Sequence, residues 1–193
     1  VGMIYGATGH LNFGALRMAS AEPGLAGALP AYLGLLVLAF LLKAGAFPLF
    51  AWLPASYHTL PAPVLALVGG LLTKVAAYVL LRLLGDVFVA TPGILLEALG
   101  WLALVTMVSG VLGAAYHWDL RRILAFHIVS QIGYLLLGIA LATPAAAAAT
   151  VYFLFHNILV KANLFLIAGL MFAAAGHYDL RRIGGLYPAR PLL

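Results

Sequence analysis

Five long apolar stretches restrict what this sequence can fold into. They span residues 31–53, 64–84, 93–116, 123–142 and 146–175, and each is close to the roughly 20 residues that a helix needs to cross a bilayer. Backbone groups in a bilayer must hydrogen-bond within the chain, so only helices or closed barrels fit, and these stretches are too long for barrel strands. We expect a sixth, truncated helix before residue 8. The sequence therefore predicts an all-α, polytopic transmembrane helix bundle in one partial domain, residues 1–193.

Composition agrees with this class and excludes several others. The chain is 65% hydrophobic and 8% charged, far from the balance of a soluble domain. Its net charge of +5 does not indicate nucleic-acid binding, because the basic residues never form a continuous stripe. The absence of cysteine removes thiolate nucleophiles and cysteine-ligated metals. With no catalytic triad, metal cluster or phosphate loop, we expect no enzyme active site, metal or cofactor here. The chain reads as an internal piece of a longer membrane protein.

The arginines indicate how the bundle is oriented. One side of the membrane carries Arg121, Arg122, Arg181, Arg182 and Arg190, and the other carries Arg17 and Arg82. Because cytoplasmic loops are enriched in Lys and Arg, the "DLRR" side is predicted to be cytoplasmic. The "DLRR" sequence belongs to a short repeat, the HxDLRR motif, which occurs as "HWDLRRI" (117–123) and "HYDLRRI" (177–183). It is either a pair of similar membrane-exit signals or a repeated docking surface for a neighbouring subunit.

The lysines are distributed differently from the arginines. All seven arginines lie near segment ends, whereas Lys43, Lys74 and Lys161 lie inside the apolar segments. A charge there is costly and normally faces a protein interior or a hydrated path. An amine, unlike a guanidinium, readily gains and loses a proton when it is desolvated. Snorkelling to the headgroups is the alternative, but Lys43 and Lys74 lie about ten residues from either segment end, roughly 15 Å from each surface.

Pro48 interrupts the first apolar stretch. A proline removes one backbone donor and disrupts the helix, here at the carbonyl of Ala44. Broken helices at membrane depth are tolerated where they are buried or line a hydrated cavity. A simple packing kink is the alternative. Beside Lys43, a helix break near Pro48 favours a path that admits water.

Further polar residues share helix faces with the lysines. Tyr78 and Asn157 are each spaced four residues from a lysine, and histidine can pass protons near neutral pH. No acidic residue lies mid-segment, so we expect at least one lysine to pair with an acid outside this chain. A lone intramembrane polar residue usually only hydrogen-bonds a neighbouring helix, but together these residues favour a proton relay. His156 would carry protons together with the three lysines. The supporting members are His127, Ser130, Gln131 and Tyr134 on one face, with Tyr78 and Asn157.

Three passages carry a family resemblance. "KAGAFPLFAWLPASYHTLPAPVLALVGGLLTKVAAYVLLR", "DLRRILAFHIVSQIGYLLLGIAL" and "FHNILVKANLFLIAG" with the following "HYDLRRIGGLY" resemble the antiporter-like membrane subunits. This family is shared by Mrp-type sodium/proton antiporters, whose D subunit is the most similar, and by the proton-pumping arm of NADH:quinone oxidoreductase. The resemblance covers nearly the whole chain. It implies a fragment of a larger fold of two inverted repeats, each with a broken helix.

The resemblance also implies roles for individual residues. Lys43 matches the lysine on the first broken helix, Lys74 the central lysine of the next helix, and His156 with Lys161 a later polar motif. The family pairs the first lysine with a glutamate on an earlier helix, upstream of Val1. Asn157 departs from the family pattern, because many members have a second histidine there.

The implied function is proton translocation within a multisubunit antiporter that exchanges Na⁺ or another monovalent cation. Its partners would be the lipid bilayer and other subunits, in a bacterial inner membrane. The first alternative is a proton-pumping subunit of complex I or a membrane-bound hydrogenase. The second is a non-conducting scaffold, in which the three lysines could be replaced by Met or Leu without loss of transport.

Overall fold

The computed structural model describes residues 1–21, 29–88 and 91–184. Within them the chain is helical, and its only β pairing is an isolated antiparallel bridge between Asp119 and Asp179. This confirms the predicted all-α class. The α-helices are α1 (Gly2–Thr8), α2 (Phe13–Ser20), α3 (Leu29–Ala44), α4 (Trp52–Tyr57), α5 (Ala62–Arg82), α6 (Gly93–Tyr116), α7 (Leu120–Ala140) and α8 (Pro144–Ala175).

Within the described residues, four helices are long and apolar enough to cross a membrane. They are α5 with the π-helical turn that continues it (Leu83–Val87), α6, α7 and α8, while α3 is apolar but shorter. Their ends follow local sequence signals. The Asp119 carboxylate accepts the backbone N–H groups of Arg121 and Arg122 at the start of α7, and the Thr143 hydroxyl accepts that of Ala146 at the start of α8. Such caps satisfy donors that a helix leaves unpaired.

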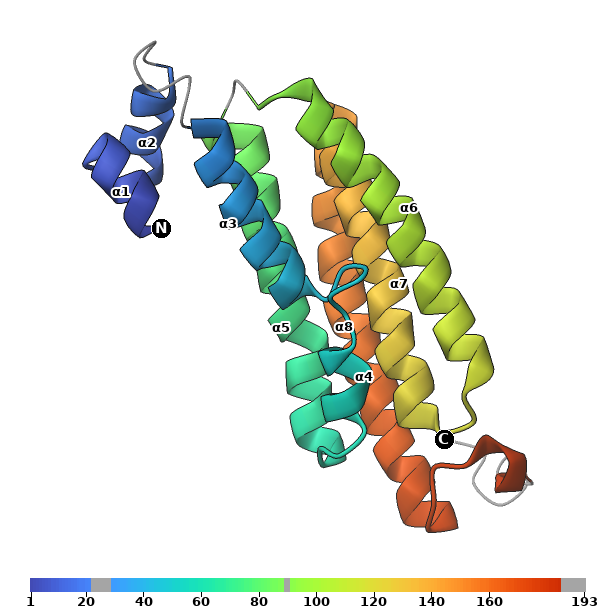
Figure 1. The fold of residues 1–193 in the computed structure, drawn as a ribbon. Coiled ribbons are helices and arrows are strands. Elements are labelled where there is room, and N and C mark those ends of the chain that lie inside the picture. The colour runs from blue at the N-terminus through green and yellow to red at the C-terminus, as the bar shows by residue number, and fades with distance from the viewer. Residues whose placement is uncertain (22–28, 89–90, 185–193) are drawn as a thin grey trace.

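The long helices pack as an antiparallel bundle (Figure 1). α6 packs along α7, and α5 packs along α8, with α3 on the outer side of α5. At Gly70 the backbones of α5 and α8 approach closely. A Cβ atom there would lie 3.4 Å from the carbonyl oxygen of Ile158 and 3.8 Å from the Ala162 Cβ. Small residues at membrane-helix interfaces permit such an approach.

The first predicted stretch, residues 31–53, is not one helix. It is divided into α3 and α4 by residues 45–51, which include Pro48, so the predicted helix break near Pro48 is present. α3 ends at Ala44, because Gly45 adopts a left-handed φ of 80° and both Gly45 N–H and Ala46 N–H donate to the Leu41 carbonyl, at 3.0 and 3.1 Å. A left-handed glycine is a common helix terminator. The break is therefore set at Gly45, before the proline is reached.

Two contacts hold the broken segment in place. The Trp52 indole Nε1 donates to the carbonyl of Leu42 at the end of α3, at 3.0 Å. The Phe47 backbone N–H donates to Thr106 Oγ1 on α6, at 3.1 Å. The break is thus tied both to the helix it terminates and to a transmembrane helix.

The first 21 residues differ from the sequence-based expectation. A truncated helix was expected before residue 8, and α1 occupies Gly2–Thr8. The second helix, α2, was not expected. Its signal was present in Asn12, whose side chain accepts the Gly14 backbone N–H and caps the helix. The segment after Asn12 is short and mixes apolar, polar and charged residues, so it did not stand out as a helix in the sequence.

Candidate functional site

Two lysines are buried between the facing helices α5 and α8. Lys74 is 1% exposed and Lys161 is 0% exposed. The Lys74 Nζ donates to the Gly69 carbonyl on its own helix, at 2.7 Å. That carbonyl lies where α5 packs on α8, because a Cβ on Gly69 would meet the Phe165 ring. The two amines therefore belong to one layer of the bundle, and both are buried, as the sequence predicted.

Polar atoms without hydrogen-bond partners accumulate in this layer. Among the described residues, the Lys161 Nζ, the Thr73 Oγ1 and both amide atoms of Asn157 are buried and unpartnered within the protein. Buried polar groups are normally satisfied by protein or by water. Because several such atoms lie on α5 and α8, they make the interior between these helices polar.

Lys43 does not lie in this buried layer. It is the penultimate residue of α3. None of the other described residues buries its side chain, which is exposed. Lys43 lies inside the predicted stretch 31–53 but next to the helix break, because α3 stops one residue later. A helix C-terminus carries partial negative charge from its free carbonyls, so the last turn is a favourable place for an ammonium group.

The structure separates the predicted supporting residues into two groups. Ser130 on α7 is buried, and Gln131 beside it has a buried, unpartnered Oε1. The others have exposed side chains on the described part of the chain. His156 lies outside the buried layer, with its ring stacked on Tyr152 at a centroid distance of 6.4 Å. The exposed group comprises His127, Tyr134, His156 and Tyr78.

Three threonines that are buried in the described part of the chain were missed by the sequence reasoning. Thr73 and Thr106 are each 0% exposed, and Thr150 is 4% exposed. Thr73 precedes Lys74, and Thr106 accepts the N–H of Phe47 from the helix break. A lone polar residue inside an apolar stretch was the available signal, as in "LLTKV" and "LVTMV".

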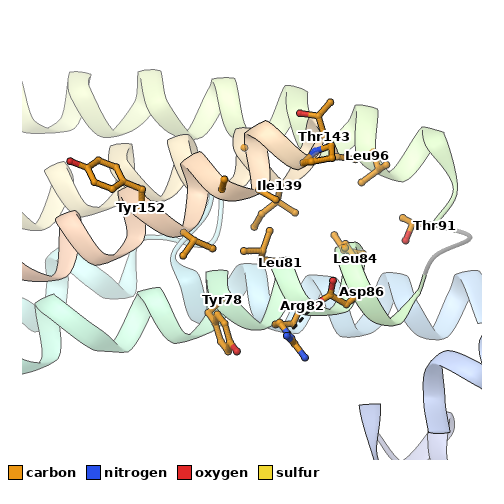
Figure 2. A pocket seen from close by; sticks show the side chains of 17 residues that line it. Tyr78, Leu81, Arg82, Leu84, Asp86, Thr91, Leu96, Ile139, Thr143 and Tyr152 are labelled. Carbon is orange, nitrogen blue, oxygen red and sulfur yellow. Dashed lines mark ion pairs between the residues drawn. The ribbon is translucent and has the colours of Figure 1, made fainter. Parts of the chain in front are cut away.

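A cavity of about 900 Å³ opens at the bundle end where α5 and α7 finish and α8 begins. Its wall is mostly apolar, with Leu81, Leu84 and Ile139 among the lining side chains (Figure 2). The Arg82–Asp86 ion pair, 3.3 Å long, lies on its α5 side. Tyr78, one helical turn from Lys74, also lines it. The cavity therefore approaches the lysine layer from the end opposite the two HxDLRR motifs.

The described residues contain no group of three or more His, Cys, Asp or Glu side chains able to hold a metal. Among the described residues, the buried charged side chains are instead the two lysines. Buried ionisable groups on facing membrane helices, with unpartnered polar atoms beside them, are characteristic of integral membrane proteins that move protons or ions.

Comparison with known proteins specifies the family. The family described as "NADH:quinone oxidoreductase/Mrp antiporter, TM" matches residues 1–193, and the chain belongs to it. Over 193 residues the chain is 42% identical to the D subunit of the Na(+)/H(+) antiporter of Alkalihalophilus pseudofirmus and 37% identical to that of Bacillus subtilis. All of this chain is aligned in both cases, but only 39% of each relative.

Two solved structures have the same arrangement of helices. A chain in the Mrp complex from Dietzia sp. superposes with a TM-score of 0.89 and 36% identity, covering 99% of this chain and 35% of that chain. A chain of the membrane-bound sulfane sulfur reductase, an archaeal respiratory membrane complex, gives a TM-score of 0.83 and 25% identity. The match covers 100% of this chain and 39% of that one. The predicted family and fold class are confirmed.

Proposed function

We propose that this chain forms the proton-conducting part of a D-type subunit in a multisubunit antiporter that exchanges protons for Na⁺ or another monovalent cation. The observation that carries the proposal is the pair of buried lysines, Lys74 and Lys161, on facing helices. Its support includes the two antiporter relatives at 42% and 37% identity. The other subunits of such a complex and the lipid bilayer are its proposed partners.

The proposed path begins at the helix break. Lys43, exposed at the end of α3, would be held by a glutamate on an earlier helix of the full-length protein. Arrival of a proton would weaken that pair and drive a proton toward Lys74. Water held by the unpartnered atoms of Thr73 and Asn157 would link Lys74 to Lys161. His156 would pass the proton onward, with His127, Ser130, Gln131, Tyr134 and Tyr78 as supporting polar groups.

We further propose that the protein lies in the bacterial inner membrane with both HxDLRR motifs on the cytoplasmic side. The structure places Arg121, Arg122, Arg181 and Arg182 at one end of the bundle, since residues 118–120 pair with residues 178–180. Arg190 lies outside the described residues. An excess of arginine at one end favours the cytoplasm.

The proposal is tested with the full-length protein and its partner subunits in inside-out vesicles. Respiration acidifies the lumen, Na⁺ is added, and proton efflux is followed with a pH-sensitive dye. Lys74→Ala should reduce exchange at least about tenfold, the scale of a lost proton-transfer group. Lys74→Arg should also be impaired, because guanidinium does not release its proton. Undiminished exchange in Lys74→Ala would contradict the proposal.

A redox-driven proton pump is the second candidate, favoured by the likeness to a chain of an archaeal respiratory membrane complex. It would use the same lysines but would need redox turnover in another subunit. Cation-driven proton movement in vesicles energised by an imposed pH gradient alone, without a redox substrate, distinguishes the antiporter from the pump.

A further inference from the structure

The two copies of the HxDLRR motif bind one another. The Leu120 N–H donates to the Tyr178 carbonyl at 3.0 Å, and the Leu180 N–H donates to the Trp118 carbonyl at 3.0 Å. Asp119 and Asp179 face each other as an antiparallel bridge between these bonds. Asp119 therefore meets its equivalent Asp179, and the flanking residues exchange partners across this pair, in an approximately two-fold arrangement.

The side chains repeat this exchange. The Arg121 guanidinium carbon lies 3.9 Å from the centroid of the Tyr178 ring. In return, the Arg181 guanidinium carbon lies 5.7 Å from the centroid of the Trp118 ring. An arginine over an aromatic face is attractive because the ring face is electron-rich. Each motif thus supplies the cation for the aromatic residue of the other.

Each arginine is also oriented by the aspartate of its own motif. Arg121 Nη2 lies 3.1 Å from Asp119 Oδ2, and Arg181 Nη2 lies 2.8 Å from Asp179 Oδ2. The same aspartates accept the backbone N–H groups that follow them. Each aspartate therefore fixes the orientation of the guanidinium group that lies over the aromatic ring of the other motif.

α8 needs such an anchor because its length does not fix its depth. At 1.5 Å per residue, its 32 residues extend about 48 Å, against a hydrocarbon core of about 30 Å. A helix longer than the bilayer can tilt or shift at modest cost. Its position along its own axis, and with it the position of Lys161 relative to Lys74, must come from contacts with the rest of the protein.

We propose that the paired motifs form a clamp that sets the axial position of α8, and that this clamp stays closed during transport. Tyr178 follows the end of α8 by three residues, and Trp118 precedes α7 by two. The clamp therefore joins the end of the helix carrying Lys161 to the start of α7. Tyr178, Trp118, Arg121 and Arg181 are positioning residues for the lysine layer, a role that rests on the proposed function.

The first experiment measures helix position without using transport. Gly70→Cys and Ala162→Cys are introduced together into the full-length complex, after replacement of any native cysteines outside this cysteine-free stretch. A Cβ at position 70 lies 3.8 Å from the Ala162 Cβ, within the range for a disulfide. Oxidation in membranes, followed by mass spectrometry of the linked peptides, gives the cross-linking yield.

Tyr178→Ala or Arg121→Ala should lower this yield by about two- to fivefold. This is the change in an equilibrium constant that corresponds to the loss of one exposed cation–π contact. Tyr178→Phe keeps the ring under Arg121 and should leave the yield unchanged. Tyr116→Ala, at a neighbouring side chain that is 83% exposed, is the matched control and should also be neutral. An unchanged yield in Tyr178→Ala and Arg121→Ala would overturn the clamp, whether or not Lys74 conducts protons.

The second experiment asks whether the clamp opens during transport. Asp119 and Asp179 form the bridge pair that lies between the two backbone hydrogen bonds. The Cα atoms of such a pair are about 4.5 Å apart, so Asp119→Cys with Asp179→Cys can be oxidised to a covalent closure. The oxidised protein should exchange protons at least as fast as the reduced one. Loss of exchange on oxidation, recovered on reduction, would show that the clamp must open.

A last measurement separates positioning from general stability. Tyr178→Ala should change the pH profile of exchange per folded complex, because Lys161 would sit in altered surroundings, and Tyr178→Phe should restore the profile. A Tyr178→Ala profile of unchanged shape, with only the amount of complex reduced, would reject the positioning role. If Lys74→Ala has already shown no effect on exchange, only the cross-linking results bear on the clamp.

Discussion

At the scale of single residues, Lys161 combines complete burial with an Nζ that has no hydrogen-bond partner among the described residues. Burying such a group costs free energy that a similar apolar side chain does not. We predict that Lys161→Met stabilises the complex by about 1–3 kcal/mol, in the range found when buried charged groups are replaced by apolar ones, while abolishing exchange. Thermal unfolding and vesicle transport measure the two effects.

The comparison variant for this prediction is Lys43→Met. Because the Lys43 side chain is exposed on the described part of the chain, its replacement should change stability by no more than about 0.5 kcal/mol. If Lys161→Met destabilised the complex instead, this would contradict the prediction. It would mean that the Lys161 ammonium group makes stabilising hydrogen bonds to protein groups.

Asp179 gives a prediction about pH. The hydrogen-bonded Arg181 guanidinium lowers the pKa of Asp179 to about 2. Because this folded-state pKa lies below that of the unfolded chain, the stabilisation is complete above about pH 5 and disappears only as the pH falls toward 2. Asp179→Asn should therefore lower the melting temperature equally at about pH 6 and about pH 9. A deficit that differs between the two pH values would show that the clamp titrates in the working range.

At the scale of secondary-structure elements, the helix break depends on Gly45. Its φ is 80°, and a Cβ there would lie 2.9 Å from Leu53 Cδ1. Gly45→Ala should destabilise the protein by about 1–2 kcal/mol, the cost of a left-handed conformation for a residue with a side chain. Gly34→Ala is the matched control, because Gly34 lies inside α3 with no atom within 4 Å of an added Cβ. It should stabilise by about 0.5–1 kcal/mol, and thermal unfolding compares the two.

The break also shows what sequence reasoning could and could not provide. Apolar length located the long helices, because a bilayer-crossing segment is a strong signal in itself: α6 (Gly93–Tyr116) corresponds to the stretch predicted at 93–116. Pro48 led to the expectation of a broken helix, and the break includes Pro48, but it begins at Gly45, which terminates α3. Lys74 and Lys161 could be predicted as buried from their central positions. Lys43 could not be placed correctly, because its position depended on where α3 ends.

The exposure of some residues of the predicted relay could not be predicted for a different reason. A spacing of three or four residues places side chains on one helix face, but it does not tell whether that face meets another helix of this chain. On the predicted α7 face, the side chains of His127 and Tyr134 are exposed in the described part of the chain, whereas Ser130 between them is buried. Asn157, by contrast, lies on α8 and is buried in the interior of the bundle, where α8 packs against α5. Only tertiary packing distinguishes the two cases.

At the scale of the whole molecule, the chain spans 39% of the length of the two antiporter relatives it matches. The two ends of its bundle differ in charge: the HxDLRR end carries Arg121, Arg122, Arg181 and Arg182, and the other carries the Arg82–Asp86 pair. The surfaces of α3 and α8 that expose Lys43 and His156 are where we expect the remainder of the protein to supply partners.

The proposed sidedness can be tested with one cysteine at each end of the bundle. Tyr116→Cys lies beside the first HxDLRR motif, and Ala145→Cys lies in the first turn of α8 at the opposite end; both positions are exposed. A membrane-impermeant maleimide should label Tyr116→Cys in inside-out vesicles only and Ala145→Cys in right-side-out vesicles only. The reverse pattern would place the arginine motifs outside the cytoplasm and contradict the positive-inside assignment.

The reciprocal clamp has a consequence for how this family can diverge. Trp118 is the partner of Arg181, and Tyr178 is the partner of Arg121, so neither motif can compensate within itself for the loss of its aromatic residue or its arginine. A tolerated change in one copy should be accompanied by a matching change in the other. Across homologous sequences, positions 118 and 181, and likewise 121 and 178, should therefore covary as crossed pairs, although each pair joins residues far apart along the chain.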